Sequence, residues 1–164
     1  MTVPRDYQRG RVYAWERLDV APHGPSPVPF AAAQGMVDAI WAESGLCYPP
    51  KVEKLPGQSR RVLAHATRLV LRLPPAVPCW CLLHELAHAM AATHDGETDL
   101  HGPRFMGLYL RLLTRYLRLD EAALLASLRA AGIDVDPDAV PPFLDPLAQR
   151  TERSGTMAGG EGAA

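Results

Sequence analysis

The sequence is short of several residue types that would point to particular classes of protein. It has no asparagine and only two lysines among 17 basic residues. Arginine, alanine and proline are abundant instead, a bias typical of GC-rich coding that carries no functional information. The three cysteines, Cys47, Cys79 and Cys81, are an odd number without the spacing of a disulfide framework. Cys79 and Cys81 lie two residues apart, so on a helix their side chains point in different directions. We therefore expect reduced, buried cysteines, as in a cytoplasmic protein.

An excess of one charge and long hydrophobic stretches are also missing. The 17 basic and 18 acidic residues nearly balance, which gives no general attraction to polyanions. No uncharged run approaches the ~18 residues of a membrane-spanning helix. Residues 1–10 lack the apolar core of a signal peptide. These absences predict a cytoplasmic protein without membrane association.

The most informative pattern that is present is His84-Glu85-Leu86-Ala87-His88, an HExxH motif inside the apolar run 77–90. The run predicts a buried helix, and histidines four positions apart lie on the same face of a helix. Their imidazoles can therefore bind one Zn²⁺. Glu85 projects about 100° further around the axis, where its carboxylate can accept a proton from a water beside the metal. Burying these polar groups without partners would cost several kcal/mol, and a metal removes that cost.

A catalytic zinc usually has three protein ligands and keeps one position for water, and two histidines compete for the third place. His94 has the spacing of the motif HExxHxxGxxH, but Ala91 stands where glycine would let the chain turn back sharply. His101 opens the segment HGPRF, in which the proline is typical of a first helical turn. It lies four residues before Phe105, where an apolar stripe begins. We favour His101 as the third ligand and place His94 in the loop between two helices.

The order HELAH, loop, HGPRF resembles the SprT-like zinc metallopeptidase domain, and most closely a small group of bacterial metallohydrolases, chiefly from actinobacteria. That group also begins with an Arg-Asp…Gln-Arg…Val-Tyr…Glu segment, seen here at residues 5–16. The resemblance covers roughly residues 4–136. It implies that the two motif histidines and the HGP histidine bind zinc and that Glu85 is the general base. Many SprT-like proteins add a cysteine-based zinc ribbon that helps to bind DNA. No cysteine follows the HGP segment here, which weakens any transfer of a DNA-repair role.

The remaining patterns predict an α+β fold of the zincin-like (SprT-like) minimal metalloprotease type, mostly helical with a small three-stranded sheet beside the HExxH helix. The β-rich runs that predict its strands are residues 52–55, 61–65 and 68–73. Helices are expected over residues 5–18 and 30–44, over the motif run and the HGP segment, and between an Asp120 cap and Gly132.

The chain is expected to form a single domain over residues 1–150. Val12, Tyr13 and Trp15 are apolar enough to pack the first helix onto it. Residues 151–164 are small and glycine-rich, with Met157 as their only large apolar side chain. They cannot bury enough surface to offset the entropy of ordering, so we expect a disordered tail.

Four arginines share one face of the HGP helix, without an acid between them: Arg104, Arg111, Arg115 and Arg118. One interpretation is a basic strip that binds nucleic acid. The interpretation that we favour is the solvated face of an amphipathic helix.

The sequence thus predicts a zinc-dependent hydrolase, foremost a metallopeptidase that acts on a peptide or protein substrate with Glu85 as general base. Two alternatives stay open: a regulatory protein that keeps zinc for stability, and a nucleic-acid-associated protein. Arg104, Tyr109 and Tyr116 lie near the motif in the sequence, and none is singled out as the group that stabilises an oxyanion.

Overall fold

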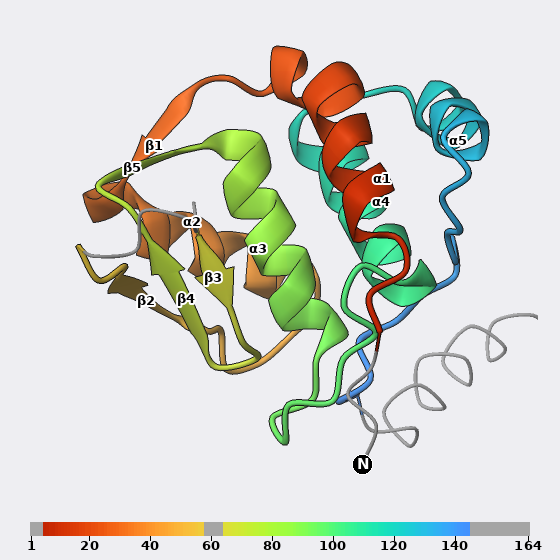
Figure 1. Ribbon diagram of the computed structural model, residues 1–164. Helices are drawn as coiled ribbons and strands as arrows, with labels where there is room; N and C mark the ends of the chain where they lie inside the picture. Colours follow the sequence, from red (N-terminus) through yellow and green to blue (C-terminus); the bar gives the residue numbers. More distant parts are fainter. Residues whose placement is uncertain (1–4, 58–63, 145–164) are drawn as a thin grey trace, which may run out of the picture.

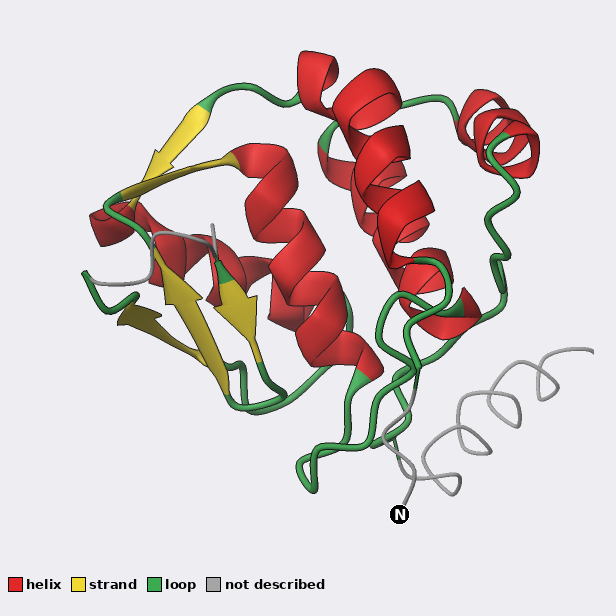
Figure 2. Cartoon of the chain, in the orientation of Figure 1, coloured by secondary structure: helices red, strands yellow, loops and turns green. Residues whose placement is uncertain are grey.

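The computed structural model describes residues 5–57 and 64–144. Within them the chain forms α-helices together with a two-stranded and a three-stranded sheet, which confirms the expected α+β class (Figure 1). Helices make up most of the molecule and the strands gather at one side of it (Figure 2). No helix of the described residues is long and apolar enough to cross a membrane.

The helices follow the expected order with shifted ends. They are α1 (Arg9–Trp15), α2 (Phe30–Glu43), α3 (Cys79–Ala91), α4 (Pro103–Tyr116) and α5 (Glu121–Ala130). α1 begins four residues later than expected, with the Asp6 carboxylate accepting a hydrogen bond from the backbone N–H of Arg9 at 3.1 Å. A π-helical turn (Glu16–Val20) and a 3₁₀ turn (Ala21–His23) continue it. At α5 the expected Asp120 cap is confirmed, since its Oδ1 accepts from the N–H of Ala123 at 2.7 Å.

The three-stranded sheet has the order β2-β4-β3 and stands beside α3 (Figure 1). β2 (Lys51–Lys54) is parallel to β4 (Val70–Leu73), and the two-residue β3 (His65–Ala66) is antiparallel to β4. Two expected strands overlap β2 and β4. The third was expected at 61–65, of which residues 61–63 lie outside the described residues; the observed β3 begins at His65.

The start of the strand expected at 68–73 is wrong, because residues 67–70 form a turn. The Thr67 hydroxyl accepts hydrogen bonds from the backbone N–H groups of Leu69 (3.3 Å) and Val70 (3.1 Å). The alternation of polar and apolar residues over 68–73 predicts a half-buried strand with Leu69 inside, but Arg68 is buried and Leu69 is 56% exposed. Within β4 the predicted alternation holds, since Leu71 and Leu73 are buried and Arg72 is exposed.

The buried Arg68 joins α2 to the segment that follows α5. Its guanidinium carbon lies 4.6 Å from the ring centre of Trp41 and 4.4 Å from that of Phe143. Nη2 donates to the carbonyl of Tyr48 at 3.0 Å, whereas Nη1 has no hydrogen-bond partner among the described residues. An arginine stem can fill apolar space in this way while its planar head stacks on aromatic rings.

A pair of short proline-containing strands was not expected from the sequence. β1 (Pro27–Pro29) is antiparallel to β5 (Ala76–Pro78). The hydrogen bonds that the prolines cannot donate come from their neighbours: Phe30 N–H binds the carbonyl of Pro75 at 2.9 Å, and Cys79 N–H that of Ser26 at 3.0 Å. Because Phe30 and Cys79 are the first residues of α2 and α3, this ribbon fixes where both helices begin.

The motif helix α3 lies between the three-stranded sheet and the pair formed by α1 and α4 (Figure 1). Every side chain from Cys81 to Ala87 on it is buried, so the expected buried helix is confirmed for most of the run. The cysteines are free, as expected, but the expectation that all are buried is wrong for Cys47, which is exposed. Cys79 is half-buried.

Candidate metal centre

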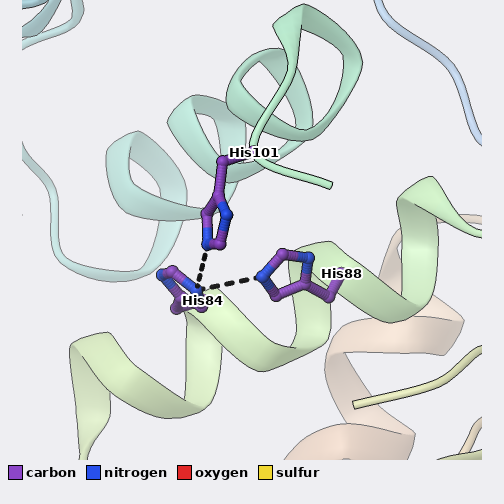
Figure 3. Close-up of side chains that lie close together, drawn as sticks. All are labelled: His84, His88 and His101. Carbon is purple, nitrogen blue, oxygen red and sulfur yellow. Dashed lines mark hydrogen bonds between the residues drawn. The ribbon is translucent and has the colours of Figure 1, made fainter. Parts of the chain in front are cut away.

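Three histidine side chains converge on one point in the interior (Figure 3). His84 and His88 come from successive turns of α3, and His101 comes from the residues just before α4. Nε2 of His84 lies 3.1 Å from Nε2 of His88 and 3.4 Å from Nε2 of His101. The structure thus brings together the three residues expected from the sequence as metal ligands. His94 is placed elsewhere, on the exposed loop after α3, where its side chain is 71% exposed.

Two carboxylates from the N-terminal part of the chain form hydrogen bonds with the Nδ1 atoms of His84 and His101, the ring nitrogens that do not take part in the Nε2 contacts above. Nδ1 of His84 donates a hydrogen bond to Glu16, whose side chain is 4% exposed, and Nδ1 of His101 donates to Asp6 at 2.6 Å. Because a carboxylate only accepts, both Nδ1 atoms carry the hydrogen. In the neutral form of the two rings, the Nε2 atoms of His84 and His101 therefore offer lone pairs toward each other.

This arrangement fits a metal ion. A proton can link only one pair of these nitrogens at a time, whereas a cation satisfies all three lone pairs together. Imidazole nitrogens bound to a tetrahedral ion at ~2.0–2.1 Å lie about 3.3 Å apart, close to the separations of the two pairs above. Backing of ligand histidines by carboxylates is also the usual support of protein metal sites. The group of His84, His88 and His101 could hold a metal ion.

The charges around the triad favour a cation at its centre. Burial acts to lower the pKa of His84, but the hydrogen bond and charge of Glu16, with help from Glu85, outweigh burial and raise it. Burial and then the neighbouring His84 and His101 hold the pKa of His88 well below its ordinary value. Burial likewise lowers the pKa of His101, against the pull of Asp6. His88 and His101 are thus neutral, which is the form that binds metal.

Glu85 lies beside the triad and takes no part in it. Its side chain faces a cavity of about 450 Å³ whose wall also includes His84, Tyr13 and Trp80. Burial raises the pKa of Glu85 to about 7; His84 opposes this rise and Glu16 adds to it. No hydrogen bond from a described residue stabilises the carboxylate. A buried carboxylate that is open to a cavity and has a pKa near neutrality suits proton transfer.

The HGP segment explains how His101 reaches the triad. The carboxylate of Asp99 accepts hydrogen bonds from the N–H groups of Arg104 (2.7 Å) and Phe105 (3.2 Å), and so caps the start of α4. A Cβ on Gly102 would come 2.8 Å from the backbone oxygen of Asp99, so only glycine fits this turn. The side chain of Gln8 completes the support: its amide N–H donates to the carbonyl of His101 at 2.9 Å.

No family model, curated protein or solved structure matches this chain. The resemblance to SprT-like peptidases therefore remains an expectation carried by the motif residues, and the site has to be interpreted from its own geometry.

Sequence reasoning missed the residues that support the site from the N-terminal segment: Asp6, Gln8, Tyr13 and Glu16. Tyr13 was expected to pack on the domain with Val12 and Trp15. Those two are buried, but Tyr13 is 42% exposed and stands against the ring of His101. A signal was present, because residues 5–16 recur with the HExxH and HGP motifs in the group that the chain resembles. It gave no indication of which residues contact the histidines.

The four arginines expected on the HGP helix do not form a free basic strip, and Arg118 lies beyond the end of α4 at Tyr116. Arg104 donates to the carbonyl of Ala91 at 3.5 Å, and Arg111 to that of Ala139 at 3.0 Å. Arg115 forms an ion pair with Glu43 at 3.6 Å. These contacts engage three of the four guanidinium groups with the protein itself, which favours the interpretation without nucleic acid.

Proposed function

We propose that this protein is a zinc-dependent hydrolase of the peptidase type, with a SprT-like, zincin-like fold. His84, His88 and His101 would hold the zinc, and Glu85 would be the general base. The observation that carries the proposal is the position of Glu85, buried next to His84 on a cavity and without a hydrogen-bonding partner among the described residues. A site that keeps zinc only for stability does not need such a carboxylate.

Zinc bound at the triad would lower the pKa of a water toward ~7 and polarise the carbonyl of a substrate. Glu85 then accepts a proton from the attacking water as the new carbon–oxygen bond forms. It passes this proton to the amine nitrogen as the carbon–nitrogen bond breaks, so the products are a carboxylic acid and a free amine. Glu16 and Asp6 keep the hydrogens of His84 and His101 on Nδ1 throughout.

The surroundings of the cavity support an extended substrate. Ala64, the residue before β3, is part of the cavity wall. β3 lies at the edge of the described three-stranded sheet and pairs only with β4 there. A peptide that enters the cavity could add to this edge through main-chain hydrogen bonds.

The experiment that tests the proposal compares wild type with Glu85→Gln. Elemental analysis should find one zinc per chain in both, because the substitution removes no ligand. A mass-spectrometric cleavage profile on a mixed peptide library should show hydrolysis by wild type alone, with the variant slower by at least about 100-fold. Glu97→Gln, on the exposed loop after α3, is the matched control and should cleave like wild type.

Two results would contradict this proposal in different ways. A zinc-loaded wild type that cleaves no peptide would favour the regulatory alternative. A Glu85→Gln variant that has lost its zinc would mean that Glu85 is a ligand or a structural partner.

A further inference from the structure

Tyr13 occupies a place that the proposed reaction leaves without a role. It lies on α1, and the centre of its ring is 5.1 Å from that of His101, edge to face, and 6.1 Å from that of His84. The side chain lines the same cavity as Glu85 and is 42% exposed. It is thus beside two of the three candidate ligands and in the wall of the cavity that Glu85 also lines.

The other groups considered for stabilising an oxyanion are engaged elsewhere. The phenol of Tyr109 is buried and donates to the carbonyl of Trp80 at 3.4 Å. The phenol of Tyr116 donates to Glu43 at 2.6 Å, and Arg104 donates to Ala91. None of the three lines the cavity that holds Glu85.

We propose that Tyr13 is a catalytic residue that donates a hydrogen bond to the carbonyl oxygen of the scissile bond, an inference that rests on the proposed peptidase function. When water adds to the carbonyl carbon, this oxygen gains negative charge, and a donor already in place stabilises it most at that moment. Arg9, whose guanidinium carbon lies 5.5 Å from the centre of the Tyr13 ring, adds a positive charge on the same side.

The geometry separates this role from a packing role. The buried side chains of α1 are Val12 and Trp15, which anchor the helix. Tyr13→Phe keeps the ring and its contacts with His84 and His101 and removes only the hydroxyl. Tyr7→Phe removes a hydroxyl from a tyrosine of the same segment that is 75% exposed and outside the cavity, so it is the matched control.

The test measures two properties of the zinc-loaded proteins. On a peptide that wild type cleaves, Tyr13→Phe should lower kcat about 100-fold and change KM little, as for the loss of an oxyanion-stabilising donor. Calorimetric titration with acetohydroxamate, a small zinc chelator with a carbonyl oxygen, should show about tenfold weaker binding to Tyr13→Phe. Zinc content should equal that of wild type, and Tyr7→Phe should match wild type in every measurement.

Each other outcome overturns the inference. Equal kcat and equal acetohydroxamate affinity in Tyr13→Phe and wild type would remove Tyr13 from the reaction. Loss of zinc in the variant would make the residue a support for His101. Wild type that binds no acetohydroxamate would have no accessible position at the metal. If wild type binds the chelator but cleaves no peptide, the peptidase proposal fails, and equal affinities would then rule out the Tyr13 donor independently.

Discussion

Glu16 accepts a hydrogen bond from Nδ1 of His84 across 68 positions of the sequence. Both side chains are almost completely buried, 4% and 6% exposed. The bond determines which nitrogen of His84 carries the hydrogen and which offers a lone pair to a metal. Together with the bond between Asp6 and His101, it makes the N-terminal segment part of the candidate metal centre.

These carboxylates should therefore control metal affinity. We expect Glu16→Gln and Asp6→Asn each to weaken zinc binding about 10- to 100-fold, because both substitutions keep the shape and remove the charge. Competition with a chromogenic chelator measures the affinity. Asp19→Asn, one turn from Glu16 and outside the triad, should leave it unchanged. Equal affinities in all three variants would show that the two carboxylates do not support the metal.

The choice between His101 and His94 as third ligand can be tested by metal content. His101→Ala should lose most of its zinc, because it removes one of three converging nitrogens. His94→Ala should keep one zinc per chain, since His94 lies on an exposed loop. Elemental analysis after dialysis against a weak chelator gives the answer. The reverse result would assign the third place to His94.

Arg68 should contribute to stability mainly through packing. Arg68→Ala would leave a gap between Trp41 and Phe143, and we expect it to lower the free energy of unfolding by about 2 kcal/mol or more. Arg68→Met should recover most of this, because it fills the gap and removes the unpartnered Nη1. Arg72 is exposed and pairs with Glu53, so Arg72→Ala should change the free energy of unfolding by no more than about 0.5 kcal/mol. Urea unfolding measures all three, and an Arg68→Met variant as unstable as Arg68→Ala would contradict the packing argument.

The same substitution at two helical glycines should have opposite effects. A Cβ at Gly107 on α4 would come 1.7 Å from the backbone oxygen of Asp136, so Gly107→Ala should lower the free energy of unfolding by more than about 2 kcal/mol. A Cβ at Gly35 on α2 would have nothing within 4 Å, so Gly35→Ala should raise the free energy of unfolding by about 0.5–1 kcal/mol. Thermal denaturation of the two variants checks the pair. A stable Gly107→Ala protein would mean that α4 and the Asp136 segment are not in close contact.

The parts of this structure that were predictable from the sequence are those governed by local rules. The helix around His84 and His88 follows from spacing and apolar pattern, and the turn before α4 follows from its glycine and proline. The bonds from Asp6 and Glu16 depend on how α1 docks against α3 and α4, which no local pattern encodes. The β1–β5 ribbon was missed because prolines argue against strands. Its ladder uses N–H groups of residues just outside the prolines.

Gln8 has consequences for the order in which the molecule can assemble. Its side chain donates to the carbonyls of His101 (2.9 Å) and Asp134 (3.2 Å) and accepts from the N–H of Asp134 at 2.6 Å. A chain that grows from its N-terminus can form the bond from Gln8 to His101 once residue 101 is added, but the two bonds between Gln8 and Asp134 require residue 134. The support that Gln8 gives to the backbone of His101 and Asp134 together is therefore complete only once residue 134 has been made, 33 residues after the third histidine.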